Sequence, residues 1–140
     1  MDYVDTSVFV AAFVDEVHTR RAEHALTGRG ASELAISDWT IAELSSALSL
    51  KLRTGSIDAG TRGAALDAFA SMIAESLVLF PVERAHFRAA ATFSDRHTLN
   101  LRALDALHLA VAAEHGAVLV TLDRRMVDAA KALGVAARLA

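Results

Sequence analysis

The chain has 140 residues, a formal net charge of −3 at pH 7 and a hydrophobic content of 54%, and it contains no cysteine. This length is enough for one domain with its own core, and the hydrophobic content excludes a disordered tail. Because the chain has no cysteine, disulfides and thiolate metal sites are excluded. The absence of cysteine favours a reducing, cytoplasmic location. With no apolar run of about eighteen residues and no basic region before an apolar stretch at the N-terminus, neither a membrane span nor a secretory signal is predicted.

The charge balance permits a nucleic-acid partner without indicating one. A net negative chain lacks the basic face that is typical of such proteins. However, twelve of the fourteen basic residues are arginines, whose guanidinium groups bind phosphate through two parallel hydrogen bonds. If four acids gathered around a cation, the remaining charges would be close to balance.

Short apolar runs and helical periodicity predict an alternation of strands and helices along the chain. In order, we predict a strand running into Asp5, helix 7–27 closed by Gly28 and Gly30, strand 34–36, helix 39–53, helix 58–76, strand 77–80, helix 83–97, helix 101–115, strand 117–121, helix 124–133 and a short strand 135–139. This alternation is typical of a parallel sheet covered by helices on both faces. We therefore expect one α/β domain spanning residues 1–140.

Two acids follow directly after predicted strands. Asp5 ends the first strand and precedes Thr6 and Ser7, and Asp123 lies two residues beyond Thr121 at the end of the strongest strand. Open α/β sheets bind ligands at the carboxyl ends of their strands. The alternative is that each aspartate caps the helix that follows it.

Two further acids lie within helices that are largely apolar. Glu43 is one of them, and its alternative role is that of an ordinary exposed helix residue. Asp105 belongs to a stripe with Arg102 and His108, because a spacing of three keeps side chains on one side of a helix. An ionised aspartate is costly to bury without a partner or a metal, although pairing with Arg102 would also explain it. His108 itself suits a structural or helix-face role equally well.

One carboxylate pocket would account for all four acids at once. Converging carboxylates repel each other and raise one another's pKa unless a cation neutralises them. Their oxygen atoms suit Mg²⁺ or Mn²⁺. Such a pocket is suited to phosphoryl chemistry, since a bound cation activates water and stabilises charge on phosphate oxygens.

The motifs Asp5-Thr6-Ser7, Ala42-Glu43-Leu44, Leu104-Asp105-Ala106 and Thr121-Leu122-Asp123 resemble, in order and spacing, the signature of PIN domains, and among these the VapC-type toxins of toxin–antitoxin pairs. The resemblance implies a three-layer α/β/α sandwich with a central parallel sheet of about five strands. It also implies a hydrolase, an endoribonuclease that cleaves RNA with Mg²⁺- or Mn²⁺-activated water. Carried over by position, the metal ligands and catalytic acids would be Asp5, Glu43, Asp105 and Asp123, with Ser7 and Thr121 supporting them.

The same resemblance implies an antitoxin partner, an RNA substrate and a homodimer, and the composition predicts no membrane association. The arginines nearest to the acids in sequence are candidate phosphate contacts, or else ordinary exposed helix residues: Arg96, Arg102, Arg124 and Arg125. Two other classes stay open, a non-catalytic module that binds RNA or an antitoxin and a small-molecule phosphatase. The first has no need of mutually repelling acids, and the second lacks an Asp-x-Asp motif after the first strand.

Overall fold

The computed structural model describes residues 1–27 and 33–140. The described chain forms one five-stranded parallel sheet with the strand order β3-β2-β1-β4-β5. The strands are β1 (Asp2–Val4), β2 (Leu34–Ser37), β3 (Leu77–Phe80), β4 (Val118–Thr121) and β5 (Ala137–Leu139). The helices are α1 (Thr6–Phe13), α2 (Thr19–Leu26), α3 (Asp38–Arg53), α4 (Ala59–Glu75), α5 (Arg84–Asp95), α6 (Ala103–Glu114) and α7 (Arg124–Leu133), with a 3₁₀ turn η1 (His97–Leu99).

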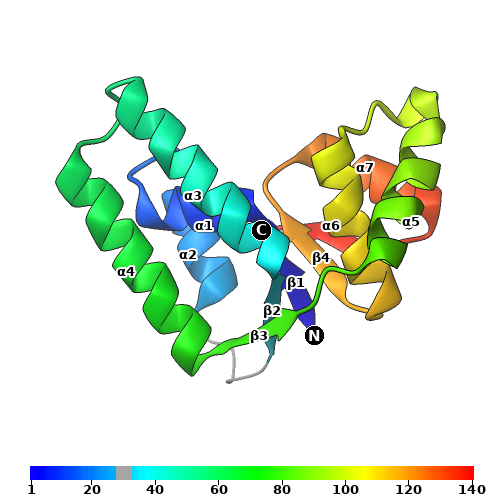
Figure 1. Ribbon diagram of the computed structural model, residues 1–140, viewed down its shortest axis with the longest axis horizontal. Coiled ribbons are helices and arrows are strands. Elements are labelled where there is room, and N and C mark those ends of the chain that lie inside the picture. The colour runs from blue at the N-terminus through cyan, green and yellow to red at the C-terminus, as the bar shows by residue number, and fades with distance from the viewer. Residues whose placement is uncertain (28–32) are drawn as a thin grey trace.

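Helices cover both faces of the sheet, as the alternation of elements predicts (Figure 1). Helices α1 to α4 pack on one face, and α5 to α7 pack on the other. Neighbouring strand residues point to opposite faces: Val4 and Val120 belong to the α1–α4 core, whereas Tyr3 and Leu119 belong to the core beneath α6 and α7. The three-layer α/β/α sandwich is therefore confirmed.

The topology brings the ends of three strands together at one edge of the sheet. β1 lies between β2 and β4, and Val4 is in register with Val120. The chain leaves β1 toward α1, β2 toward α3 and β4 toward α7, all at their carboxyl ends. Between β1 and β4 the strand order reverses direction, which is the place where open α/β sheets form ligand crevices.

The helix predicted over residues 7–27 is wrong as a single element, because the chain breaks it into α1 and α2. The Thr19 hydroxyl donates to the carbonyl oxygens of Ala11 (2.7 Å) and Val14 (3.2 Å), and it accepts the Glu16 N–H (2.9 Å). These contacts satisfy backbone groups that a continuous helix would otherwise pair. Gly28 and Gly30, the predicted end signals, lie outside the described residues.

The other predicted elements are present, with ends that differ by up to two residues, within the usual scatter of helix and strand boundaries. In the part of the chain that the structure describes, no helix is both long and apolar enough to cross a membrane.

Candidate active site

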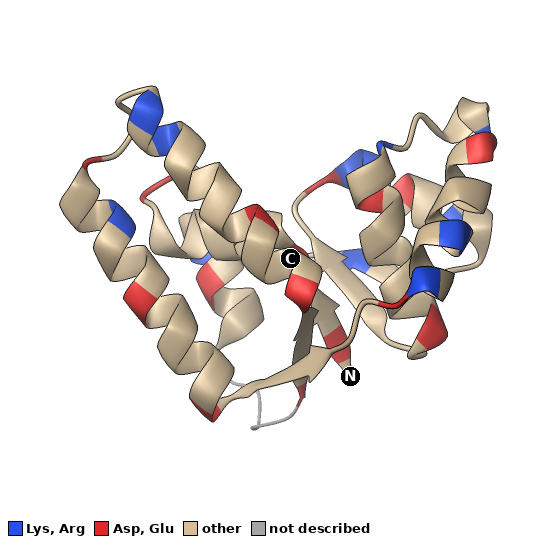
Figure 2. Cartoon of the chain, viewed as in Figure 1, with Lys and Arg blue, Asp and Glu red and all other residues tan. Residues whose placement is uncertain are grey.

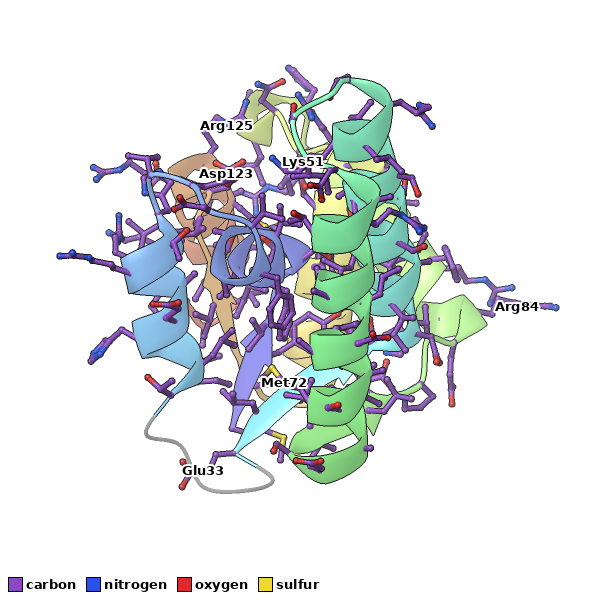
Figure 3. All side chains as sticks on the ribbon, turned by 90° about the vertical axis from the view of Figure 1, so that its left-hand side faces the viewer. Glu33, Lys51, Met72, Arg84, Asp123 and Arg125 are labelled. Atoms are coloured by element: carbon purple, nitrogen blue, oxygen red, sulfur yellow. The ribbon has the colours of Figure 1, made fainter. Side chains whose placement is uncertain are left out.

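All four predicted acids line one cavity of about 440 Å³ at the carboxyl edge of the sheet. Asp5 precedes α1, Glu43 lies on α3, Asp105 lies in the first turn of α6, and Asp123 follows β4. Figure 2 shows acidic residues on α3, on α6 and in the turn after β4. Figure 3 shows Asp123 and Arg125 at the same end of the molecule as Lys51, with Glu33 at the opposite end. The structure thus brings together carboxylates that are more than a hundred positions apart in sequence.

Asp5 is held by two hydroxyl groups rather than by the helix that it precedes. It occupies the N-cap position of α1, but its side chain makes no capping hydrogen bond. Its Oδ2 accepts from Ser7 Oγ (2.5 Å) and from Thr121 Oγ1 (2.8 Å). Its side chain is only 10% exposed. Both predicted supporting residues therefore contact Asp5, and the helix-cap alternative does not describe its side chain.

Glu43 is half-buried and is also held by two donors. Its Oε2 accepts from Thr6 Oγ1 (2.6 Å) and from His108 Nε2 (2.7 Å). Burial acts to raise the pKa of Glu43, but the hydrogen bond and charge of His108, together with the Thr6 hydroxyl, outweigh it and lower the pKa. Glu43 is therefore an ionised residue with defined partners rather than an ordinary exposed helix residue.

Asp5 and Glu43 share one arrangement, in which two donors bind one carboxylate oxygen and the other oxygen is left open. Among the described residues no hydrogen bond reaches Glu43 Oε1 or Asp5 Oδ1, and His108 Nε2 lies 3.5 Å from Asp5 Oδ1. A carboxylate oxygen has lone pairs to give to a ligand. The fold therefore presents two oriented, open oxygens at the same end of the sheet.

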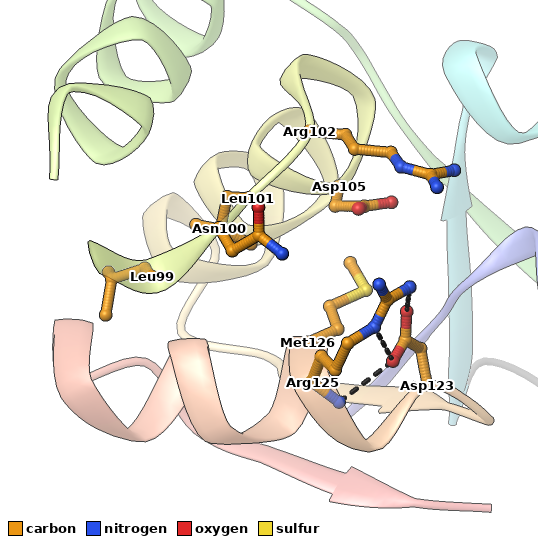
Figure 4. Close-up of a pocket in the computed structure, with 8 residues that line it drawn as sticks. All are labelled: Leu99, Asn100, Leu101, Arg102, Asp105, Asp123, Arg125 and Met126. Carbon is orange, nitrogen blue, oxygen red and sulfur yellow. Dashed lines mark hydrogen bonds and ion pairs between the residues drawn. The ribbon is translucent and has the colours of Figure 1, made fainter. Parts of the chain in front are cut away.

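Asp105 lies where neighbouring negative charges oppose its ionisation. Burial raises the pKa of Asp105, and the charges of Asp5 and Asp123 raise it further. Within the described chain no ion pair joins Asp105 to Arg102, so the pairing alternative is not observed. Figure 4 shows Asp105 across a smaller cavity from Asp123 and Arg125. A bound cation would relieve this repulsion.

Asp123 combines the two roles that the sequence leaves open. Its Oδ1 accepts the backbone N–H of Arg125 (2.8 Å), so it caps α7, and its Oδ2 pairs with the Arg125 guanidinium (3.0 Å). Burial acts to raise the pKa of Asp123, but these contacts with Arg125 prevail and lower it. The same side chain lines the cavity, so capping and membership of the site are compatible.

The four candidate arginines differ in their relation to the acids. Arg102 and Arg125 line the smaller cavity of about 150 Å³, which shares Asp105 and Asp123 with the main one (Figure 4). Arg124 is exposed on the first turn of α7 and lines neither of these cavities. Arg96 donates to the carbonyl oxygen of Ala132 (2.9 Å), near the C-terminal end of α7, whereas the acids lie at its N-terminal end. The structure therefore brings only Arg102 and Arg125 to the site.

A model of the PIN domain family matches residues 3–132. The chain belongs to the PIN domain family. No curated protein matches this PIN domain by sequence.

Solved structures share the fold over nearly the whole chain. VapC20 of Mycobacterium tuberculosis, described as a Sarcin-Ricin loop cleaving toxin, is 19% identical, with 96% of each chain covered and a TM-score of 0.73. VapBC2 of Rickettsia felis, solved with a DNA fragment from its promoter, is 18% identical, with 100% of this chain and 99% of that chain covered and a TM-score of 0.68. A toxin–antitoxin complex from Klebsiella pneumoniae is 17% identical, with 91% and 90% covered and a TM-score of 0.63. At these identities the likeness establishes a common fold.

The side chains of this PIN domain fit a divalent cation. One ligand atom each from Asp5, Glu43 and His108 lie within 4.8 Å of one another. Carboxylate oxygens dominate the set, which suits Mg²⁺ or Mn²⁺. In the same cavity burial raises the pKa of Asp105, and the negative charges of Asp5 and Asp123 raise it further.

His108 contributes to the site in a way that the sequence alone does not reveal. It is 1% exposed, and it joins the Tyr3 hydroxyl through Nδ1 (2.9 Å) and Glu43 through Nε2 (2.7 Å). Burial acts to lower the pKa of His108, but its hydrogen bond to Glu43 and the surrounding acids raise it. The signal that could have indicated its role is its position three residues after Asp105, on the same side of the helix.

Proposed function

We propose that this PIN domain is a divalent-cation-dependent endoribonuclease that hydrolyses RNA phosphodiester bonds, and that it is the toxin of a toxin–antitoxin pair. The observation that carries the proposal is the convergence of Asp5, Glu43, Asp105 and Asp123 on one cavity, with the ionisation of Asp105 opposed by two of the others. Asp105, whose ionisation is opposed by burial and by its neighbours, is costly to keep in this cavity unless it serves a cation.

In this proposal the four acids hold one or two Mg²⁺ or Mn²⁺ ions. Such a cation, when bound, lowers the pKa of water and stabilises negative charge on phosphate oxygens. Ser7 and Thr121 orient Asp5 through their hydroxyl groups. Arg102 is placed at the smaller cavity beside Asp105, where its positive charge suits an RNA phosphate. Arg125 has a different role, because its guanidinium is engaged by Asp123.

The choice of RNA and of an antitoxin partner rests on the similar structures. VapC20 is described as a toxin that cleaves the Sarcin-Ricin loop, and the Klebsiella pneumoniae structure is a toxin–antitoxin complex. An antitoxin segment lying across the cavity would block access to the acids. We expect the partner to be a DNA-binding protein that is encoded by a short reading frame beside this gene. This protein should copurify with the chain and inhibit it.

We also propose that two copies of the chain associate. A groove of about 460 Å³ lies between α5 and α6 and is lined mostly by apolar residues. Phe87 and Leu104 line this groove, and they are 56% and 45% exposed. The groove also contains Trp39 and Ser94, whose Nε1 and Oγ atoms are buried without a hydrogen-bond partner in the described chain. Exposed apolar surface of this kind marks contact sites between proteins.

The nuclease is tested by incubating the purified protein with bulk RNA in Mg²⁺, in Mn²⁺ and in EDTA, beside Asp5→Asn. We expect cleavage with either cation, none in EDTA, and a loss on the order of 100-fold in the variant, as for other groups that stabilise developing charge. Asp67→Asn is the matched control, because Asp67 is an exposed acid on α4 that does not line the cavity.

Cleavage that survives both chelation and the Asp5→Asn substitution would overturn the proposal. RNA binding without cleavage in any cation would favour the non-catalytic module instead. Cation-dependent hydrolysis of a small phosphate monoester, with RNA left intact, would favour the phosphatase.

A further inference from the structure

A buried hydrogen-bonded chain runs from the end of β2 to the acidic cavity. Ser37 Oγ lies 2.7 Å from the Tyr3 hydroxyl, which lies 2.9 Å from His108 Nδ1. His108 Nε2 lies 2.7 Å from Glu43 Oε2. Ser37 and Tyr3 are fully buried and His108 is 1% exposed, so the chain is closed to solvent until it reaches Glu43.

The direction of the last hydrogen bond follows from the chemistry of its acceptor. An ionised carboxylate only accepts, so Nε2 carries the proton and donates to Glu43. With both ring nitrogens engaged, the imidazole has one orientation. Tyr3 is itself held by stacking on Phe80, with ring centroids 6.1 Å apart and planes 1° apart. The position of the His108 ring is therefore set by residues of β1, β2 and β3, which belong to the rigid sheet.

The orientation of the Glu43 carboxylate depends on the His108 ring more than the orientation of the Asp5 carboxylate does. Its side chain is long, starts from α3 and is 24% exposed. Within residues 1–27 and 33–140 its hydrogen-bond donors are Thr6 and His108, both on Oε2. Together they direct Oε1 away from these donors. Loss of the imidazole would leave one donor and would let the carboxylate rotate, which costs cation affinity when ligands must converge.

We infer that His108 is a positioning residue of the active site, which holds Glu43 in its cation-binding orientation through the buried chain from Ser37 and Tyr3. This inference rests on the proposed function and extends it by assigning a role to a residue outside the four acids. A ring nitrogen of His108 also lies within 4.8 Å of ligand atoms of Asp5 and Glu43. We assign His108 to positioning rather than to cation binding, because its Nε2 donates to Glu43 and the residue does not line the cavity.

The test compares Mn²⁺ affinity, measured by calorimetry without RNA, for the wild type, His108→Ala and His108→Gln. Outer partners of metal ligands commonly contribute about 10- to 100-fold to affinity. We expect a loss in that range for the alanine variant and recovery of most of it by glutamine, whose amide offers an N–H donor. Tyr3→Phe removes the partner of Nδ1 and is expected to cause a smaller loss in the same direction.

His115→Ala is the matched control. His115 lies at the end of the same helix and stacks on Phe80 (ring centroids 3.8 Å apart), so its loss affects packing without removing a partner of Glu43. Unchanged Mn²⁺ affinity in this control, together with a loss in folded His108→Ala or Tyr3→Phe, supports positioning. Wild-type affinity in the folded His108 variants would overturn it.

Two further measurements distinguish the positioning role of His108 from direct cation binding by His108 and from a failure of the proposed nuclease function. If His108 were a ligand, pulsed electron paramagnetic resonance of bound Mn²⁺ would detect nitrogen coupling in the wild type that is lost in His108→Gln, and that result would overturn the positioning role. The comparison with the variant is needed because His18 also lines the cavity. Crystal structures of the cation-free variants are expected to show the Glu43 carboxylate displaced in His108→Ala and retained in His108→Gln. Because this comparison needs neither cation nor RNA, it stands even if the wild type fails to cleave RNA.

Discussion

At the scale of single residues, the four acids have two kinds of environment. Asp5 and Glu43 each have one oxygen bound by two donors, which orients the other. Asp105 and Asp123 differ in the direction of their pKa shifts. Burial, and then the charges of Asp5 and Asp123, raise the pKa of Asp105, whereas the contacts of Asp123 with Arg125 outweigh burial and lower the pKa of Asp123. The site therefore combines two carboxylates oriented by hydrogen-bond donors with one carboxylate whose ionisation its surroundings oppose.

The raised pKa of Asp105 leads to a pH-dependent prediction for Asp105→Asn. Between the unfolded and folded pKa values, the unfolded state releases the Asp105 proton more readily, so rising pH destabilises the wild type through this group. Asparagine cannot ionise. We expect the variant in EDTA to melt about 2 to 4 °C higher than the wild type at neutral pH, with the difference vanishing toward pH 4.

Differential scanning calorimetry across this pH range checks the prediction, with Asp128→Asn as an exposed control on α7. Excess Mn²⁺ should reverse the order, because only the wild type keeps the full set of acids. A variant that is less stable than the wild type at neutral pH in EDTA would contradict a raised pKa of Asp105.

Thr121 links two of the acids, and Thr121→Val tests that link at nearly constant volume. The Thr121 hydroxyl donates to Asp5 Oδ2 (2.8 Å) and accepts the Asp123 N–H (3.1 Å). We expect cation affinity and RNA cleavage to fall by about 10- to 100-fold, since partners of metal ligands commonly contribute that much. Titration calorimetry measures the affinity. Thr98→Val, at an exposed threonine, should match the wild type, and equal affinity in both variants would contradict the role of Thr121.

The acids could be predicted from sequence because each breaks a local pattern. An aspartate at a strand end or in an apolar helix is conspicuous in the sequence itself. The role of His108 could not be predicted from sequence, because an imidazole in an apolar helix is equally suited to simple packing. Its meaning lies in contacts with Tyr3 and Glu43, which are 105 and 65 positions away.

At the scale of elements, the order of strands and helices follows from hydrophobic patterning, but the break between α1 and α2 does not. Residues 14–18 contain neither glycine nor proline. The break is set by Thr19, whose hydroxyl reaches back eight residues to the carbonyl of Ala11. A side chain that competes for backbone groups at this distance leaves no periodic signal.

Thr19→Val tests this explanation of the break. The substitution leaves the carbonyls of Ala11 and Val14 and the N–H of Glu16 without their hydroxyl partner. We expect the free energy of unfolding to fall by about 1 to 3 kcal/mol, the usual cost of part-buried polar groups left unpaired. Equilibrium urea denaturation measures it.

Thr92→Val is the control for Thr19→Val, because Thr92 is exposed on α5 and its hydroxyl donates one hydrogen bond to the carbonyl oxygen of Arg88. Its effect should stay within about 0.5 kcal/mol, as for most surface substitutions. Equal losses in the two variants would mean that the Thr19 contacts do not stabilise the α1–α2 junction.

At the scale of the whole molecule, the acids and the apolar groove occupy different surfaces. The acids gather where β1 and β4 end, whereas the groove is formed mainly by α5 and α6. α6 connects the two, since Asp105 lines the cavity and Leu104 the groove. Association through the groove would therefore leave the cavity open to RNA. The same contact would stabilise α6, the helix that carries Asp105 and His108.

Phe87→Glu and Leu104→Glu test the proposed homodimer, because each places a charge on the apolar groove. In a symmetric pair the same patch meets itself, so one substitution introduces two like charges at the contact. We expect a dimer for the wild type and a monomer for either variant by light scattering after size exclusion, with unchanged circular dichroism. Leu50→Glu, at a leucine on α3 that is 51% exposed and outside the groove, should remain dimeric. A monomeric wild type at high concentration would refute the homodimer, and dimeric Phe87 and Leu104 variants would place its contact on another surface.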